Sequence, residues 1–331
     1  MIRFINLKSV LSFGILAISG SGHSGMETII TNLLGPKDTF LIAKRGIWDL
    51  RAETIAYKHG IPTYKTEVSF DATFTFEQIE RALQKYRPTA LFVTHGDSST
   101  GTVQKLEGLG HICHKYGTLL LVDTVVSLAA APFLMDEWEV DAVYTSTQKA
   151  LSGPAGITPV AFSERAQQKI NSRTHEPPFY FDVKLIAKQW NCFEKSKNYH
   201  HTLSPPLIWA LRSCLIELSN ETLHSVWARH TKNTALFHKM LTDYGFELLI
   251  PKPEDRLVTV TTVKLPRGCM EQDFLNYIRN KHGIVIFGGL GPTVGKALRI
   301  GIMGVNSTED VVKRVVLAMA DATRAVMKSK V

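Results

Sequence analysis

A carboxylate and an amine that follow two neighbouring apolar runs are the side chains most suggestive of chemistry. Asp123 ends the run Leu119–Asp123, and Lys149 follows the run Asp141–Ser146. Such runs are typical of buried parallel strands, so both groups are expected at strand ends. An amine nucleophile beside a fixed negative charge suits pyridoxal phosphate (PLP), because the amine forms a Schiff base and the carboxylate keeps the pyridine nitrogen protonated. A surface lysine and a helix-capping aspartate are the alternative interpretation.

A loop of small residues, Ser19-Gly-Ser-Gly-His23, lies between an apolar run and a helical pattern. Small residues let backbone N–H groups approach a phosphate, and the following helix N-terminus attracts negative charge. The spacing is neither the G-x-G-x-x-G of dinucleotide enzymes nor a nucleotide P-loop. The phosphate of a compact cofactor therefore fits better than NAD or ATP, and an ordinary tight turn is the alternative.

Three further features could belong to a site. Trp48 follows a predicted strand and could stack on a flat cofactor or lie in the core. The hydroxyl-rich run Thr94–Gly101 could bind a ring substituent or a substrate carboxylate, or serve only as a turn. Arg299 lies inside an apolar run, where burial of its charge is costly unless its fork meets a carboxylate. That carboxylate belongs either to a substrate or to a structural salt bridge.

Helical patterns alternate with short apolar runs over the first two thirds of the chain. This order predicts an α/β fold with a mostly parallel central sheet covered by helices, in which ligands bind at the carboxyl ends of the strands. The polar loops expected at those ends are Ser19–Gly25, Thr94–Gly101, Asp123–Ser127 and Thr145–Lys149.

The pattern changes after about residue 205, and we expect a large domain over residues 1–221 and a smaller α+β domain over 222–331. The elements predicted there are helices at Pro206–Leu218, His224–Tyr244 and Met270–His282, and strands within Leu257–Leu265, Ile284–Phe287 and Ala297–Ile302.

Composition excludes several classes of protein. The 331 residues carry a net charge of +8, but Lys and Arg are dispersed, so a basic enzyme with anionic ligands is favoured over nucleic-acid binding. The four cysteines are far apart, which indicates reduced thiols in an intracellular compartment. His111–His114 lacks a second ligand pair, so no metal site is expected.

The two ends of the chain carry possible targeting signals. Met1–Ile18 is apolar, basic and free of acids, like a signal or transit peptide, yet cleavage at its end would destroy the glycine loop. No other stretch is long enough to span a membrane. Ser329-Lys-Val331 differs by one conservative change from the peroxisomal Ser-Lys-Leu signal. We expect a peroxisomal protein, with the mitochondrion as the alternative.

Taken together and in this order, the motifs resemble the class V aminotransferases of PLP fold type I, and most of all their alanine–glyoxylate / serine–pyruvate aminotransferase group. The resemblance covers about residues 16 to 325. It rests on Ser19–His23, Gly46–Trp48, Thr94–Gly101, Leu121–Asp123, Ser146–Lys149, Tyr199–Thr202, Gly288–Pro292 and Leu298–Gly301.

The resemblance implies a role for each matched residue. Lys149 would be the Schiff-base lysine and proton shuttle, Asp123 the partner of the pyridinium, and Arg299 the clamp on the substrate carboxylate. The cofactor would also be bound by Ser21, Gly22, His23, Trp48, Ser98 and Gln148, and by Tyr199 and Thr202 acting on the phosphate of the neighbouring subunit of a homodimer.

The implied reaction is a ping-pong transamination in which alanine or serine donates its amino group to glyoxylate or pyruvate. A 3-hydroxykynurenine or kynurenine transaminase is the alternative in the same fold, because its site motifs would be the same. Only eighteen residues precede Ser19, where family members carry about sixty. A truncated, inactive paralogue is therefore a second alternative.

Overall fold

The structure is a computed structural model that describes residues 14–192 and 198–328. The predicted peroxisomal signal Ser329–Val331 and most of the apolar N-terminal segment lie outside the described residues, so both targeting hypotheses stay predictions.

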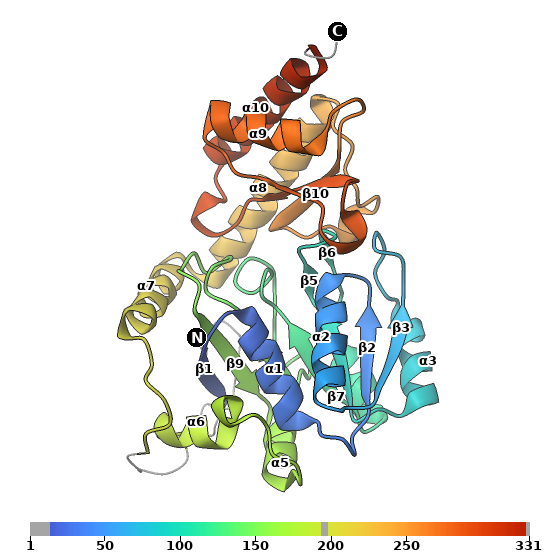
Figure 1. The fold of residues 1–331 in the computed structure, drawn as a ribbon, viewed down its shortest axis with the longest axis vertical. Coiled ribbons are helices and arrows are strands. Elements are labelled where there is room, and N and C mark those ends of the chain that lie inside the picture. The colour runs from blue at the N-terminus through green and yellow to red at the C-terminus, as the bar shows by residue number, and fades with distance from the viewer. Residues whose placement is uncertain (1–13, 193–197, 329–331) are drawn as a thin grey trace.

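A seven-stranded sheet forms the centre of the larger part of the molecule (Figure 1). All neighbouring pairs are parallel except those of β9, which runs antiparallel to both its neighbours. The prediction of a mostly parallel sheet is thus confirmed. The order is β1 (Ile15–Ser19), β9 (Ile157–Phe162), β8 (Ala142–Tyr144), β7 (Leu119–Asp123), β4 (Ala90–Thr94), β2 (Phe40–Lys44) and β3 (Thr63–Glu67).

Helices cover both faces of this sheet, because its central strands are apolar on both sides. In β4, Ala90 and Phe92 pack into one core while Leu91 and Val93 pack into the other. The first core is closed by α1 (Gly22–Leu33), α2 (Ile47–Lys58), α5 (Glu164–Ser172) and α6 (Val183–Gln189), and the second by α3 (Phe76–Tyr86) and α4 (Leu109–Lys115).

The edge strand β3 has no counterpart among the predicted elements. Its sequence, Thr-Tyr-Lys-Thr-Glu, is polar and none of its residues is buried. An edge strand of this kind lacks the apolar run that identifies a central strand. Backbone pairing with β2, in register from Phe40 with Thr63, defines it instead.

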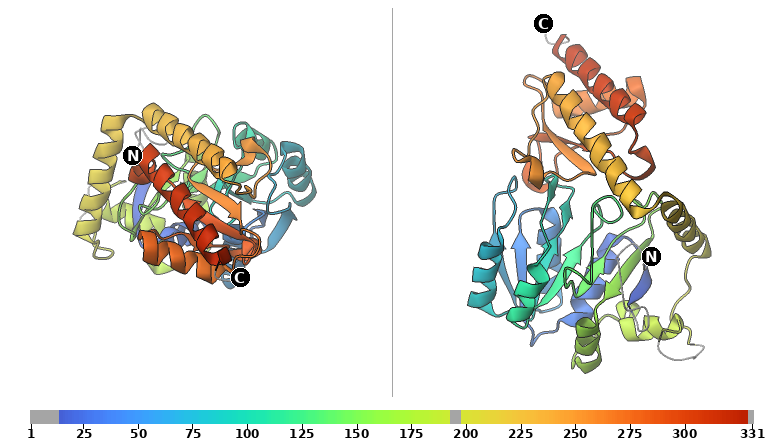
Figure 2. Two further views of the ribbon diagram at one scale, coloured as in Figure 1. Left: turned by 90° about the horizontal axis from the view of Figure 1, so that it is seen from above. Right: turned by 180° about the vertical axis from the view of Figure 1, so that it is seen from behind.

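The second part of the chain forms a smaller three-stranded antiparallel sheet, ordered β10 (Val260–Lys264), β12 (Ala297–Gly301) and β11 (Phe287–Gly288). The predicted strand Ile284–Phe287 is wrong in extent, because the chain pairs with β12 only from Phe287 onward. A core of its own joins this sheet to α8 (Leu223–Asp243), α9 (Glu271–His282) and α10 (Glu309–Lys328). Figure 2 shows α8 and α10 running side by side.

The predicted domain boundary falls at Thr222, between α7 (Pro205–Glu221) and α8. The division of the chain into a large domain over residues 1–221 and a small domain over 222–331 stays a prediction. In Figure 1 the small sheet stands above the carboxyl ends of the parallel strands. None of the helices in the described ranges is long and apolar enough to cross a membrane.

Candidate active site

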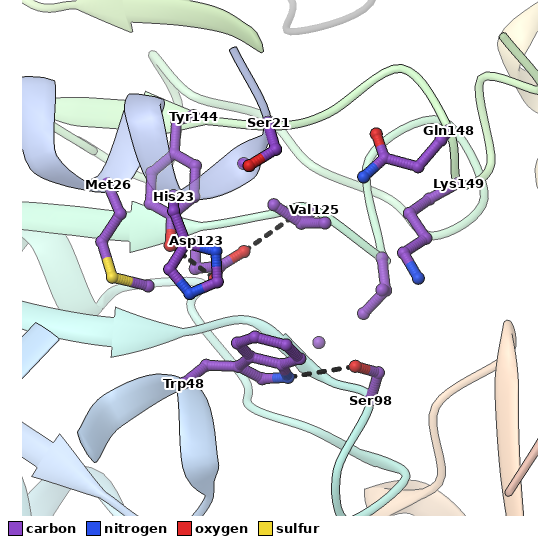
Figure 3. A pocket seen from close by; sticks show the side chains of 13 residues that line it. Ser21, His23, Met26, Trp48, Ser98, Asp123, Val125, Tyr144, Gln148 and Lys149 are labelled. Carbon is purple, nitrogen blue, oxygen red and sulfur yellow. Dashed lines mark hydrogen bonds between the residues drawn. The ribbon is translucent and has the colours of Figure 1, made fainter. Parts of the chain in front are cut away.

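The carboxyl ends of β1, β4, β7 and β8 meet at one edge of the large sheet, where their loops enclose a cavity of about 230 Å³ (Figure 3). Every residue predicted to bind the cofactor lines it, except Tyr199 and Thr202. The lining comprises Ser21, Gly22, His23, Met26, Trp48, Gly96, Ser98, Asp123, Val125, Val126, Tyr144, Gln148 and Lys149.

The glycine loop turns into α1 at the rim of this cavity. Ser21 is the N-cap, but its side chain makes no capping hydrogen bond to the helix. In the first turn Ser24 N–H donates to the Ser21 carbonyl at 2.7 Å, whereas the N–H groups of Gly22 and His23 precede the first helical hydrogen bonds and are available to an anion. A Cβ at Gly22 would lie 3.1 Å from Val125 Cγ2, a tight contact, so the turn passes close to the loop that follows β7.

Trp48 occupies the second helical position of α2, and its indole Nε1 donates a hydrogen bond to Ser98 Oγ at 3.0 Å. The ring meets His23 edge to face, with centroids 5.8 Å apart. Asp49 fixes the start of α2, because its Oδ2 accepts from the backbone N–H groups of Arg45 and Gly46, both at 3.0 Å. The indole packs against the core. Its Nε1–H edge points to Ser98, and both residues line the cavity.

Asp123 is a buried carboxylate and not an exposed helix cap. It is 4% exposed, with Oδ1 accepting from Val125 N–H at 2.7 Å and Oδ2 accepting from Tyr144 Oη at 2.5 Å. Burial raises the pKa of Asp123 to about 7. A cation placed in the cavity would favour the ionised form, so this carboxylate suits a cationic partner.

Tyr144 was not among the residues selected from the sequence, although it lines the cavity and binds Asp123. One signal was present: Tyr144 stands at a strand end, as Asp123 does. Only the pairing of β7 with β8, which places the two residues opposite each other, connects them.

Lys149 lies in the loop between β8 and β9, and in Figure 3 its amine approaches the cavity from the side opposite Asp123. Two backbone hydrogen bonds, from Ser152 N–H to the Lys149 carbonyl and from Gly153 N–H to the Thr147 carbonyl, both 2.9 Å, hold the loop. Burial and then the charge of Arg299 lower the pKa of Lys149. A depressed pKa raises the fraction of free amine, the form that acts as nucleophile and base.

Arg299 on β12 reaches the site from the small sheet. Its Nε donates to the Gly288 carbonyl at 2.8 Å and its Nη1 to the Ser98 carbonyl at 3.1 Å. Within the described residues Arg299 forms no salt bridge, so the structural ion pair considered above is not observed. It does not line the cavity itself but stands beside Ser98, which does.

Tyr199 and Thr202 lie outside the cavity. Both are exposed, and their hydroxyl groups are 2.9 Å apart in a hydrogen bond. Their predicted action on a neighbouring subunit stays a prediction. Among the described residues no group of three or more His, Cys, Asp or Glu side chains is arranged to hold a metal ion.

Comparison with known proteins identifies the family. The model of the family "Aminotransferase class-V" matches residues 3–315. The chain belongs to the class V aminotransferases. Among curated relatives of this aminotransferase, the alanine–glyoxylate aminotransferase of Rattus norvegicus is 40% identical over 316 residues, covering 95% of this chain and 76% of the relative. The enzyme of the same name from Drosophila melanogaster is 40% identical over 317 residues, covering 95% and 80%.

Solved structures of aminotransferases share the fold over 98% of this chain. The alanine–glyoxylate aminotransferase of Nostoc sp. superimposes with a TM-score of 0.93 at 35% identity, covering 98% of this chain and 84% of that one. The ureidoglycine–glyoxylate aminotransferase of Bacillus subtilis gives a TM-score of 0.93 at 26% identity, covering 98% and 82%. The predicted family and fold type are thereby confirmed.

Proposed function

We propose that this chain is a PLP-dependent aminotransferase that moves the amino group of a small amino acid, alanine in the first place, to glyoxylate. The observation that carries the proposal is one cavity that holds a buried carboxylate, Asp123, an amine of lowered pKa, Lys149, and an oriented indole, Trp48. The names of the relatives supply the substrates, and class V enzymes use PLP.

The residues present fit PLP. The N-terminus of α1, with Ser21 and Gly22, would hold the phosphate together with Gln148. Trp48 would cover one face of the ring, and Asp123 would pair with the ring nitrogen. Asp123 supports this fit independently of the family, because a carboxylate buried next to a cavity needs a cationic partner to remain ionised at low cost.

PLP, when bound, supplies an electron sink that acidifies the α-proton of an amino acid attached to it. The residues of the chain do the rest. The free amine of Lys149 takes the α-proton and returns it at a second carbon, so it serves as both base and acid. Arg299 binds the α-carboxylate through its planar fork and thereby sets which side of the amino acid faces Lys149.

The printed names of the relatives favour alanine as the donor, and serine is the other small amino acid to compare. Pyruvate, as an acceptor, differs from glyoxylate only by a methyl group in place of a hydrogen. Kynurenine and 3-hydroxykynurenine are the donors to compare, because transamination with them uses the same cofactor residues. Turnover of alanine well above that of the kynurenines would support the proposed donor, and the reverse ratio would overturn it.

The deciding experiment is the visible absorption spectrum of the purified chain with PLP, before and after addition of L-alanine. A yellow species that L-alanine bleaches, and that glyoxylate restores, is the expected result. Lys149→Ala is the matched variant: it should bind PLP without that absorption change, because the proton transfer needs the amine. An unsubstituted chain that shows no yellow species with added PLP would overturn the proposal.

The proposed assembly is a homodimer, in which Tyr199 and Thr202 act at the phosphate of the other subunit. The exposure of both hydroxyl groups supports it. Mixing two variants tests it: one is the double variant Tyr199→Phe/Thr202→Val, and the other is Lys149→Ala. Each mixed dimer should contain one intact site and so restore part of the activity. No recovery, under conditions where sedimentation shows mixed dimers, would contradict the sharing of the site.

A further inference from the structure

The phenol of Tyr144 is held against the carboxylate of Asp123 by the sheet itself. Strands β7 and β8 are parallel, and Asp123 stands opposite Tyr144 in their register. Tyr144 Oη donates to Oδ2 of Asp123 at 2.5 Å, while Val125 N–H donates to Oδ1 at 2.7 Å. Each carboxylate oxygen therefore has one donor from the protein, and the plane of the carboxylate is fixed.

The ring of Tyr144 has no freedom to leave this position. Tyr144 is 1% exposed. Its backbone carbonyl accepts from Thr124 N–H at 3.0 Å and from Thr124 Oγ1 at 2.9 Å. Helix α1 packs so closely on it that a side-chain carbon at Gly25 would lie 2.9 Å from Tyr144 Cβ. The hydroxyl is thus delivered to Asp123 by backbone and packing together.

The electrostatics of the pair favour the same arrangement. Burial is the largest effect on Asp123 and raises its pKa, whereas the hydrogen bond from Tyr144 lowers it. The charges of Asp49 and Asp97 raise it further, and His23 and Lys149 line the same cavity. Burial and the charge of Asp123 raise the pKa of Tyr144 well above its usual value, so the phenol keeps its proton and remains a donor.

We infer that Tyr144 is a positioning residue for the cofactor: it fixes the carboxylate plane of Asp123 and stabilises its ionised form, so that the ring nitrogen of PLP is held protonated. Tyr144 acts through Asp123 and moves no proton of the substrate. The inference rests on the proposed function in two respects: PLP binds in this cavity, and its ring nitrogen faces Asp123.

The test is the affinity for PLP as a function of pH in the full-length chain and in Tyr144→Phe, which keeps the ring and removes the hydroxyl. Equilibrium dialysis gives the dissociation constant without need of turnover. We expect it to rise about tenfold, the size of effect that follows the loss of a hydrogen bond to a charged group. Binding weakens as pH falls through the pKa of Asp123, and in Tyr144→Phe this weakening should begin at higher pH. With ¹⁵N-labelled PLP, the NMR shift of the ring nitrogen should move towards its unprotonated value.

Tyr277→Phe is the matched control, because Tyr277 Oη also donates to a carboxylate, Asp321 Oδ2 at 3.0 Å, on the small domain. It should change neither the affinity nor the nitrogen shift. Unchanged affinity and an unchanged shift in Tyr144→Phe would overturn the inference. If the unsubstituted chain binds no PLP, the proposed function fails first.

A double-mutant cycle separates positioning from general structural support. In Asp123→Asn the charge is gone, so adding Tyr144→Phe should weaken PLP binding little further. An equal additional loss in that background would overturn the inference, because Tyr144 would then act independently of Asp123. The full cycle uses all four affinities. Where Tyr144→Phe alone does not fold, a severalfold loss between the two Asn-containing variants still overturns the inference.

Discussion

The guanidinium of Arg299 contributes to lowering the pKa of the Lys149 amine, although the two residues come from different sheets. Arg299 is itself tied to the large domain by its hydrogen bond to the Ser98 carbonyl at 3.1 Å. The residue proposed to bind the substrate carboxylate therefore also lowers the pKa of the lysine proposed to act as the base. The proposed recognition of the substrate and the proposed base strength of Lys149 would thus depend on the same side chain.

Replacing Arg299 separates these two effects. Arg299→Lys keeps the charge but loses the planar fork, so the KM for alanine should rise about tenfold to a hundredfold, the effect of about 1.5–3 kcal/mol for a charged hydrogen bond. Arg299→Gln also removes the charge, so the pKa of Lys149 should rise in this variant. Steady-state kinetics measures the KM, and the pH dependence of the rate at which the PLP-free chain forms its yellow species with PLP reports the pKa of the Lys149 amine.

The control for Arg299 is Arg256→Gln, because Arg256 donates to the carbonyls of Ile250 and Pro251. It should leave the KM for alanine unchanged. If Arg299→Lys binds alanine as tightly as the unsubstituted chain, another group must bind the carboxylate.

Ser98 orients the indole of Trp48, and its removal should weaken PLP binding. Ser98→Ala leaves Trp48 Nε1–H without its 3.0 Å partner, so the ring is less well placed to cover the cofactor. The expected cost is about 1 kcal/mol, a severalfold rise in the dissociation constant measured by dialysis. In a Trp48→Phe background the same substitution should have almost no effect. A full effect in that background would show that Ser98 contacts the cofactor directly.

The stability of the chain without PLP should depend on pH through Asp123. Its pKa in the folded chain is about 7, above the usual value of 3.8, so the folded state binds the proton more tightly than the unfolded state. The free energy of unfolding therefore falls as pH rises between these two values, by up to about 1.4 kcal/mol per pH unit from this group. Denaturant unfolding should show a shallower fall in Asp123→Asn. An unchanged slope would mean that Asp123 is solvated in the free chain.

Saturation with PLP should oppose the fall in the free energy of unfolding with rising pH in the unsubstituted chain. A pyridinium beside Asp123 favours the ionised carboxylate, so the gain in stability on adding PLP should be larger near pH 8 than near pH 5. Thermal unfolding with and without PLP at the two pH values measures the gain. Equal gains would argue against pairing between Asp123 and the ring nitrogen.

Local sequence signals predicted most elements, and together with the family resemblance they named eight of the thirteen residues that line the cavity. Helices α8 and α9 are examples, because the patterns at His224–Tyr244 and Met270–His282 match the observed helices Leu223–Asp243 and Glu271–His282. Asp123, Lys149 and the glycine loop follow apolar runs, and the ends of parallel strands meet at one edge.

Long-range pairing was not predictable in the same way. Tyr144 reads as a core aromatic until β7 and β8 are placed in register, and β3 reads as polar loop until β2 supplies its partner. The antiparallel direction of β9 likewise depends on the whole sheet. Arg299 gave a local signal, an arginine in an apolar run, but its closeness to Lys149 depends on how the small sheet packs above the large one.

The close packing of α1 on the sheet leads to a last prediction, at Gly25. Alanine normally stabilises a helix interior by up to about 1 kcal/mol relative to glycine. At Gly25, however, a Cβ would lie 2.2 Å from Thr158 Cγ2 and 2.9 Å from Tyr144 Cβ, so helix and strands would have to separate. Gly25→Ala should therefore lower the free energy of unfolding by about 1–3 kcal/mol and weaken PLP binding, because α1 carries the turn proposed to bind the phosphate. Thr158→Ser removes the nearer methyl group but keeps the hydroxyl that donates to the Gly20 carbonyl at 3.1 Å. Stability measured by denaturant unfolding should thus be partly restored in the double variant, and a purely additive loss would show that the strain arises elsewhere.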